Sequence, residues 1–171
     1  MTRQIPLFLL GMLTLLSWTP ATFAAQRVAV FDFEIIDTSL DGETYGTRAE
    51  EKARLKKISD QLRQALAKSG QFEVVDIGPV ETAAHAANLQ ACGGCDATLA
   101  GKVGAELAIT GTVQKISNLI LNMNVYIRDV SNHKLIASKS ADFRSNTDES
   151  WSRTITYLIR NYVLAPNFGE H

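Results

Sequence analysis

The sequence predicts an α/β (α+β) fold with a mixed sheet of about five strands and helices packed against it. Three observations lead to this class. A run of strand-forming residues, 27–34, opens the domain, and a helical pattern follows over 47–70. After Gly104 the period changes from helical to alternating, and three strand patterns follow one another. Such an order predicts a sheet that is parallel or mixed at first and antiparallel later.

The first strand and the first helix have the clearest signals. Residues 27–34 begin as a continuous apolar run, which is typical of a central strand covered on both faces. Residues 37–46 are polar and contain glycine, so we expect a loop there. Thr47 and Glu50 then predict a capping box, and Gly70 ends the helix.

The middle of the chain predicts three short elements. Residues 72–75 read as a second strand, and a brief helix is expected from Pro79 to Ala87. A Cys-Gly-Gly-Cys turn leads to another short helix over 96–103.

The second half predicts three strands and a final helix. The alternating segments are 107–116, 119–128 and 134–143, and the last two should form a hairpin through 131–133. Asn146 and Glu149 then predict the start of a helix. Its apolar side chains share one face at helical spacing, and they are Trp151, Ile155, Leu158 and Tyr162.

The amino terminus predicts export. Arg3 precedes an apolar stretch over 5–18, and Thr22-Phe23-Ala24 resembles a signal-peptide cleavage site. We therefore expect residues 1–24 to be removed and residues 25–171 to form a single soluble α/β domain in the periplasm. The apolar stretch is shorter than the roughly 20 residues of a membrane span, so we expect no membrane span after cleavage.

The charge balance argues against a nucleic-acid partner. The chain has 17 basic and 18 acidic residues, and removal of Arg3 leaves a formal charge of −2. Nucleic-acid binding usually depends on a clustered basic surface, and the sequence has none.

Cys92 and Cys95 are the two cysteines of the chain. In an oxidising compartment we expect them to form a disulfide with each other. A redox-active pair is the alternative, because the following helix would favour a thiolate. A metal site that also uses His85 is a third interpretation, although structural zinc normally takes four ligands. We predict no metal ligands and no cofactor.

An acidic edge and a polar strand face are the other candidate binding surfaces. Asp32 and Glu34 lie on one side of the first strand near its carboxyl end, where ligands often bind in open α/β sheets. In the strand over 118–128, one face is apolar. The other carries hydrogen-bonding side chains, namely Asn118, Asn122, Asn124, Tyr126 and Arg128.

The segments 28–33, 72–76 and 104–113 resemble the amino-terminal domain of TolB. The same arrangement is similar to the curli-secretion protein CsgG and to the lipoprotein activators of penicillin-binding proteins, which serve the bacterial envelope. The runs 91–96, 111–122 and 146–151 resemble an uncharacterised family of exported proteobacterial proteins. That resemblance implies an association with quinoprotein dehydrogenases and alcohol oxidation.

Together these features predict a non-enzymatic accessory or binding module with an envelope or periplasmic protein partner, and they leave the oligomeric state open. No nucleophile motif, Walker loop or zinc helix occurs, so we assign no catalytic residue. Two alternatives remain, a thiol-disulfide redox protein that uses Cys92 and Cys95, and a carrier for a small molecule or a metal.

Overall fold

The computed structural model describes residues 25–169 of the 171-residue chain. The predicted signal segment, 1–24, lies outside the described residues. The strands are β1 (Gln26–Val30), β2 (Glu34–Asp37), β3 (Phe72–Val74), β4 (Leu107–Lys115), β5 (Leu121–Asp129) and β6 (Leu135–Phe143). The helices are α1 (Leu40–Tyr45), α2 (Ala49–Ser69), α3 (Gly78–Ala86), α4 (Cys95–Lys102) and α5 (Asp148–Leu158), which a π-helical turn (Ile159–Val163) and a 3-10 turn (Pro166–Gly169) follow.

These strands form one mixed sheet. The strand order is β3-β1-β4-β5-β6, and β2 also pairs with β4. β1 is parallel to β3 and to β4, and β2 is parallel to β4. β5 is antiparallel to both of its neighbours, β4 and β6. The predicted α/β class, with a parallel first half and an antiparallel second half, is therefore confirmed.

The predicted first strand is divided into β1 and β2. The amide of Phe33 donates to the hydroxyl of Ser59 on α2, 2.9 Å away. Because this amide bonds to the helix, the chain leaves the regular ladder before it pairs with β4 again. The sheet accordingly has six strands where about five were expected.

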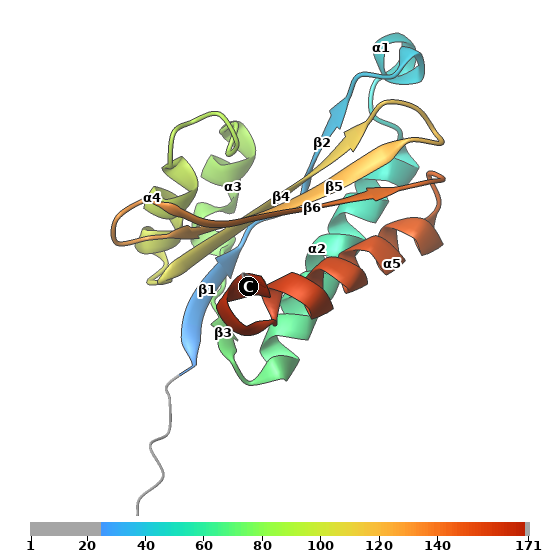
Figure 1. Ribbon diagram of the computed structural model, residues 1–171. Coiled ribbons are helices and arrows are strands. Elements are labelled where there is room, and N and C mark those ends of the chain that lie inside the picture. The colour runs from blue at the N-terminus through green and yellow to red at the C-terminus, as the bar shows by residue number, and fades with distance from the viewer. Residues whose placement is uncertain (1–24, 170–171) are drawn as a thin grey trace, which may run out of the picture.

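Helices cover the two faces of the sheet unequally (Figure 1). α2 and α5 lie together on one face, and α3 and α4 lie on the other, over β1 and β4. The first face holds the larger core, which includes Leu62, Met123 and Trp151. The second core is smaller and rich in alanine, with Phe31 as its one large aromatic residue. On this second face α4 reaches β5 near Arg128, and the helices of the described residues leave most of β5 and β6 uncovered.

The predicted starts of α2, α5 and β5 were wrong by one or two residues, and one predicted loop contains a helix. The cap of α2 is Arg48, whose amide donates to Glu51, so Thr47 and Glu50 do not form the capping box. The cap of α5 is Thr147, because the side chain of Asn146 bonds elsewhere. The loop expected over 37–46 contains the short helix α1, and β5 begins two residues later than predicted.

Among residues 25–169, none of the helices combines the length and the apolar character that a membrane span requires.

The close contact between Gly111 and Phe33 supplies a test of this packing. A β-carbon at Gly111 would overlap the Phe33 ring. We expect Gly111→Ala to lower the free energy of unfolding by about 1–3 kcal/mol, as overpacked cores do. Urea unfolding measures the change. Phe33→Leu in the same chain should restore part of the loss, and an unchanged stability of Gly111→Ala would contradict this packing.

Candidate functional site

The loop between α3 and α4 is closed by a disulfide between Cys92 and Cys95, with Cα atoms 5.6 Å apart. The predicted pairing is therefore confirmed. The sulfur of Cys92 also accepts a hydrogen bond from the amide of Cys95, 3.3 Å away. Between them, Gly93 and Gly94 have φ values of 68° and 108°, a backbone conformation that favours glycine. The disulfide thus fixes a tight turn directly before α4.

A buried ion pair attaches this turn to the sheet. Asp96, on the first turn of α4, is 2% exposed, and its Oδ2 accepts from Nε of Arg128 on β5 at 3.0 Å. Nη1 of Arg128 also donates to the carbonyl of His133, 2.9 Å away. The other carboxylate oxygen of Asp96 has no hydrogen-bond partner among the described residues. Arg128 is therefore the group that compensates the buried charge of Asp96.

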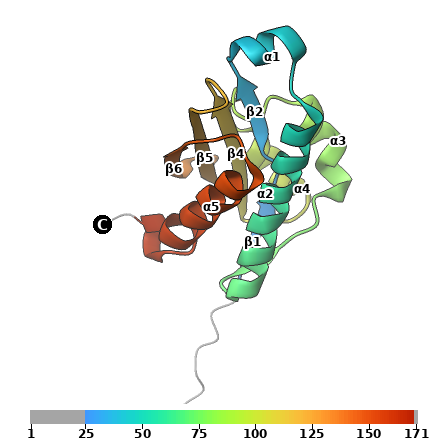
Figure 2. The ribbon, with the colours of Figure 1, turned by 90° about the vertical axis from the view of Figure 1, so that its right-hand side faces the viewer.

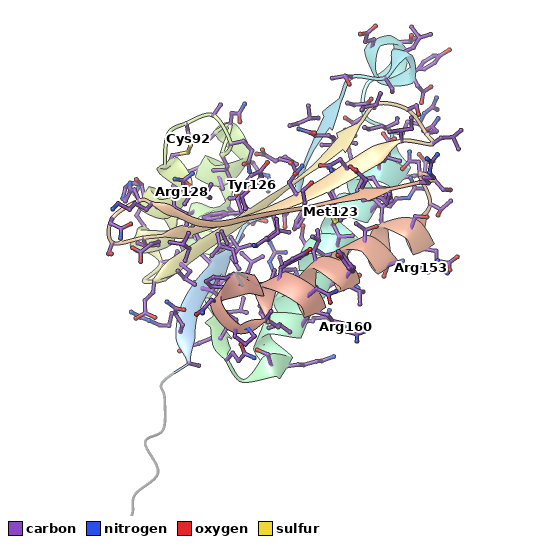
Figure 3. All side chains as sticks on the ribbon, in the orientation of Figure 1. Cys92, Met123, Tyr126, Arg128, Arg153 and Arg160 are labelled. Carbon is purple, nitrogen blue, oxygen red and sulfur yellow. A yellow bond between two sulfur atoms is a disulfide. The ribbon has the colours of Figure 1, made fainter. Side chains whose placement is uncertain are left out.

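The fold thus joins two surfaces that the sequence analysis treated as separate. Figure 3 shows Cys92, Tyr126 and Arg128 on the same side of the sheet, with the disulfide turn next to the strand. A β-carbon on Gly94 would lie 3.3 Å from Nδ1 of His133, so the turn packs closely on the β5–β6 hairpin. Asp96, which makes the connection, was not predicted as a site residue. The feature of the sequence that could have indicated Asp96 was its position directly after the second cysteine.

The polar face extends from Arg128 along β5. Asn122 donates from Nδ2 to Ser140 at 2.8 Å and to Asp142 at 2.7 Å, both on β6. Asn124 donates to the hydroxyl of Thr112 on β4 at 3.3 Å. The side chains of Asn122, Asn124, Tyr126 and Arg128 are all partly exposed. We call these four residues the polar face. Cross-strand hydrogen bonds hold its amides in place.

Asn118 does not belong to this face, contrary to the sequence prediction. It lies in the β4–β5 turn, before β5 begins. Its side-chain oxygen accepts from Nδ2 of Asn146 at 3.1 Å, and its carbonyl accepts from the amide of Asn146 at 2.9 Å. The amides of Ile116 and Ser117 both donate to the carbonyl of Ile120, which closes the turn early. Asn118 therefore connects the turn to the start of α5.

The predicted acidic edge lies near His85 on α3. Nη2 of Arg63 donates to Oδ1 of Asp32 at 2.6 Å, and Nε2 of His85 lies 3.9 Å from Oδ2. Nε2 of His85 also lies 3.8 Å from Oε1 of Glu81. These three ligand atoms of Asp32, Glu81 and His85 lie within 4.8 Å of one another, so they could converge on a cation. Arg63 already compensates part of that charge.

Glu34 lies on the same edge and is half-buried. Burial raises the pKa of its carboxyl group, while the Leu89 amide and the charge of His85 act in the opposite direction. The net effect is a pKa above the ordinary value of 4.5. This edge is therefore less strongly acidic than its composition suggests.

A second buried ion cluster lies at the other end of the sheet, and the sequence analysis missed it. Lys115 is fully buried, and its Nζ lies 2.7 Å from Glu51 and 3.0 Å from Asp37. Asn146 donates to the same oxygen of Glu51 at 2.8 Å. The sequence feature that could have indicated this cluster is the spacing of Lys115 in β4. Lys115 lies two residues after the buried Val113, and residues two apart on a strand share a face, so Lys115 is expected on the apolar face.

The cluster keeps its members ionised. Burial raises the pKa of Glu51, but hydrogen bonds from Lys115, Arg48 and Asn146 outweigh it and bring the pKa below 4.5. Burial lowers the pKa of Lys115, but Glu51 and Asp37 outweigh it and bring the pKa above 10.5. The pair is therefore charged over the whole neutral range.

The geometry defines a class of protein, a mixed-sheet α/β domain with a disulfide-closed turn next to a partly open polar sheet face. The chain belongs to the DUF3280 family, described as protein of unknown function (DUF2380), whose model matches residues 26–163. This agrees with the predicted membership of an uncharacterised family. No curated protein matches the chain.

Several solved structures are similar to the chain. The LpoB C-terminal domain from Salmonella enterica is 17% identical, with a TM-score of 0.52 over 73% of this chain and 87% of that one. The PelC dodecamer from Paraburkholderia phytofirmans is 17% identical, with a TM-score of 0.49 over 89% and 94%. TolB from Acinetobacter baumannii is 14% identical, with a TM-score of 0.41 over 80% and 28%. At such identities the likeness to the LpoB domain shows a shared fold.

The Lys115 cluster generates a prediction for stability. We expect Lys115→Met to lower the free energy of unfolding at pH 7 by about 3–5 kcal/mol, because it leaves Glu51 and Asp37 buried without their cation. The exposed Lys56, whose ion pair among the described residues is with Asp60 on the same helix, is the matched control. Lys56→Met should change stability by no more than about 0.5 kcal/mol. Equal effects of the two substitutions would contradict a structural role for the cluster.

The same cluster predicts a dependence on pH. The pKa values of Glu51 and Asp37 are lower in the folded chain than their ordinary values of 4.5 and 3.8. Their contribution is therefore fully present above about pH 4.5 and is lost as the pH falls through the folded values. Urea unfolding between pH 7 and pH 3 should show the loss. Lys115→Met should weaken this dependence on pH. An identical change of the free energy of unfolding with pH in the wild type and in Lys115→Met would contradict the role of the cluster.

Removal of the disulfide should have a local effect. Closure of so small a loop contributes about 2 kcal/mol by chain entropy, so Cys92→Ser with Cys95→Ser should lower stability by about that amount. Amide hydrogen exchange should increase in α4 and in the β5–β6 hairpin, which Asp96 and Arg128 connect, and not in α2. A uniform increase over all helices would contradict this local attachment.

Proposed function

We propose that this chain is a non-enzymatic accessory module of the bacterial periplasm, and that it binds a protein partner through the polar face and the adjoining disulfide turn. The observation that carries this proposal is the unequal cover of the sheet. α2 and α5 cover one face, whereas on the other face α4 reaches the polar face at Arg128 and leaves Asn122, Asn124 and Tyr126 partly exposed. The export signal that the sequence predicts over residues 1–24 supports the periplasmic location.

The chemistry of the polar face suits a protein surface. Its amides and phenol can donate and accept hydrogen bonds, and its one cation, Arg128, already pairs with Asp96. A partner therefore meets a surface of low net charge. Tyrosine and arginine are also, with tryptophan, enriched among the residues that contribute most to binding energy at protein interfaces. Because cross-strand hydrogen bonds hold Asn122 and Asn124, little side-chain freedom is lost on binding.

The partner that we propose is a quinoprotein dehydrogenase of the alcohol-oxidising kind. The support for this assignment is the resemblance of the runs 91–96, 111–122 and 146–151 to exported proteins that accompany such enzymes.

A specific observation favours thiol-disulfide exchange as a second candidate. Cys92 is exposed, and the amide of Cys95 points to its sulfur at the start of α4. This arrangement would stabilise a thiolate. The reduction potential separates the candidates, since structural disulfides lie below about −300 mV and exchange catalysts lie above it.

The main proposal is tested by binding to the purified dehydrogenase from the same host. We expect Asn124→Ala with Tyr126→Ala to raise the dissociation constant at least about tenfold, which corresponds to about 1.4 kcal/mol. Gln64→Ala, on the exposed side of α2, is the control and should leave the constant unchanged. Circular dichroism verifies the fold of each variant.

A photo-reactive residue at position 124, with position 64 as control, extends the test to the periplasm of the host. If position 124 cross-links to a protein other than the dehydrogenase and not to the dehydrogenase itself, the polar face is retained as a binding surface. The dehydrogenase is then rejected as its partner. Equal labelling from both positions would reject the polar face as the binding surface.

A further inference from the structure

Three ligand atoms from different parts of the chain converge near the carboxyl end of β1. Asp32 follows this strand, and Glu81 and His85 lie one turn apart on α3. Nε2 of His85 lies 3.9 Å from Oδ2 of Asp32 and 3.8 Å from Oε1 of Glu81. Since all three atoms lie within 4.8 Å of one another, they surround a common point. We call these three residues the His85 cluster.

Buried side chains of α3 determine which way this cluster faces. Val80 and Ala84 are four residues apart, so they share one side of the helix, and both pack in the smaller core. Glu81 and His85 each follow one of them by a single residue, so they lie at the edge of the packed side and face Asp32. Figure 2 shows α3 beside α2 and away from α5. The packing of the helix therefore positions both ligands.

The His85 cluster lines a small cavity with an apolar floor. The cavity has a volume of about 40 Å³, whereas a single buried water needs only about 10–15 Å³. The carboxyl group of Glu34 lines it as well, and the buried side chains of Phe31, Phe33 and Leu89 form part of its wall. Apolar walls limit the access of water and strengthen the attraction between a carboxylate and a cation. The space therefore suits a single ion.

Arg63 on α2 fixes the orientation of Asp32. Its Nη2 donates to Oδ1 of Asp32 at 2.6 Å. Its Nε and Nη2 also donate to the carbonyl of Val30, at 3.1 Å and 2.9 Å, so the guanidinium is itself held by the sheet. Because Oδ1 is engaged in this way, Oδ2 is left toward His85. Carboxylates that bind metals in proteins are held by such outer hydrogen bonds.

The cluster carries more negative charge than its neighbours compensate. Distances of 3.8 Å and 3.9 Å are too long for hydrogen bonds, so His85 does not link the two carboxylates. Arg63 pairs with Asp32. Among the described residues, Glu81 has no lysine or arginine within ion-pair distance, and Glu34 adds a third carboxyl group to the cavity. A divalent cation at the common point supplies the missing compensation.

The ligand types identify the class of ion. Calcium and magnesium take oxygen ligands, whereas zinc and its first-row neighbours combine imidazole nitrogen with carboxylate oxygen. In a tetrahedral zinc site with bonds of about 2.1 Å, the ligand atoms are about 3.4 Å apart. The side chains of His85 and Glu81 are 60% and 56% exposed, so small rotations close the remaining distance. Both sulfurs of Cys92 and Cys95 are in the disulfide, so they cannot be co-ligands of His85.

We propose that Asp32, Glu81 and His85 bind a divalent transition-metal ion of the zinc class. The two carboxylates supply oxygen ligands, and Nε2 of His85 supplies the nitrogen. Three protein ligands leave a coordination position open for water or another ligand. A cleft of about 400 Å³ between α2 and α3 shares Asp32 and Glu81 with the cavity, so solutes reach the ion from outside. The site shares no residue with the polar face or the disulfide turn.

Calorimetric titration of the mature chain, without an affinity tag, with zinc chloride tests this proposal. The wild type should bind one zinc ion per chain. His85→Asn and Glu81→Gln should each raise the dissociation constant more than about tenfold, since loss of even an outer partner costs about 10–100-fold in affinity. In NMR spectra, zinc should shift the imidazole resonances of His85 and not those of His133. Both variants should keep the circular dichroism spectrum of the wild type.

Exposed residues of the same types supply matched controls. His133→Asn in the β5–β6 turn and Glu149→Gln on the first turn of α5 should leave zinc binding unchanged. Asn124→Ala with Tyr126→Ala should also bind zinc like the wild type, which separates this site from the partner-binding surface. A wild type that binds no zinc would overturn the proposal, as would equal losses in the cluster and control variants. Displacement of zinc by an equal concentration of calcium would also overturn it, because it would indicate an unspecific acidic surface.

Discussion

The buried charge of Lys115 is the constraint on which the arrangement of this domain depends. A lysine on the apolar side of β4 has no access to water, so its charge must be compensated within the protein. Asp37 at the end of β2 and Glu51 on the first turn of α2 provide that compensation. Asn146, just before α5, bonds to Glu51 and to Trp151. One desolvated cation thereby fixes the positions of a strand and two helices.

A second ion pair serves the opposite end of the sheet in the same way. Asp96 is buried beneath the disulfide turn, and Arg128 reaches it from β5. The pair holds α4 against the second face of the sheet, but it extends no further than the β5–β6 hairpin. The rest of that face stays open and polar. The candidate binding surface thus arises because the helical cover ends where the Asp96–Arg128 pair ends.

The polar face differs in chemistry from the exposed apolar side chains of α1 and the β4–β5 turn, because these side chains differ in hydrogen bonding. On the polar face, asparagine side chains bond across to neighbouring strands, so they remain ordered while partly exposed. On α1 and in the β4–β5 turn, leucine, isoleucine and tyrosine side chains make no side-chain hydrogen bonds to other described residues and expose carbon to water. A polar surface of this kind is stable without a partner, whereas an apolar one gains free energy when it is covered.

The sequence by itself determined the α/β class and the type and order of nearly all elements, because the periods of apolar residues report which faces are buried. It also predicted the pairing of Cys92 with Cys95, the two cysteines of the chain, which the structure confirms. Only the tertiary structure decided that the disulfide turn lies beside Arg128 and that Asn118 lies outside the polar face. Those facts depend on contacts between residues far apart in the chain, such as Asp96 with Arg128, and no local period or spacing encodes them.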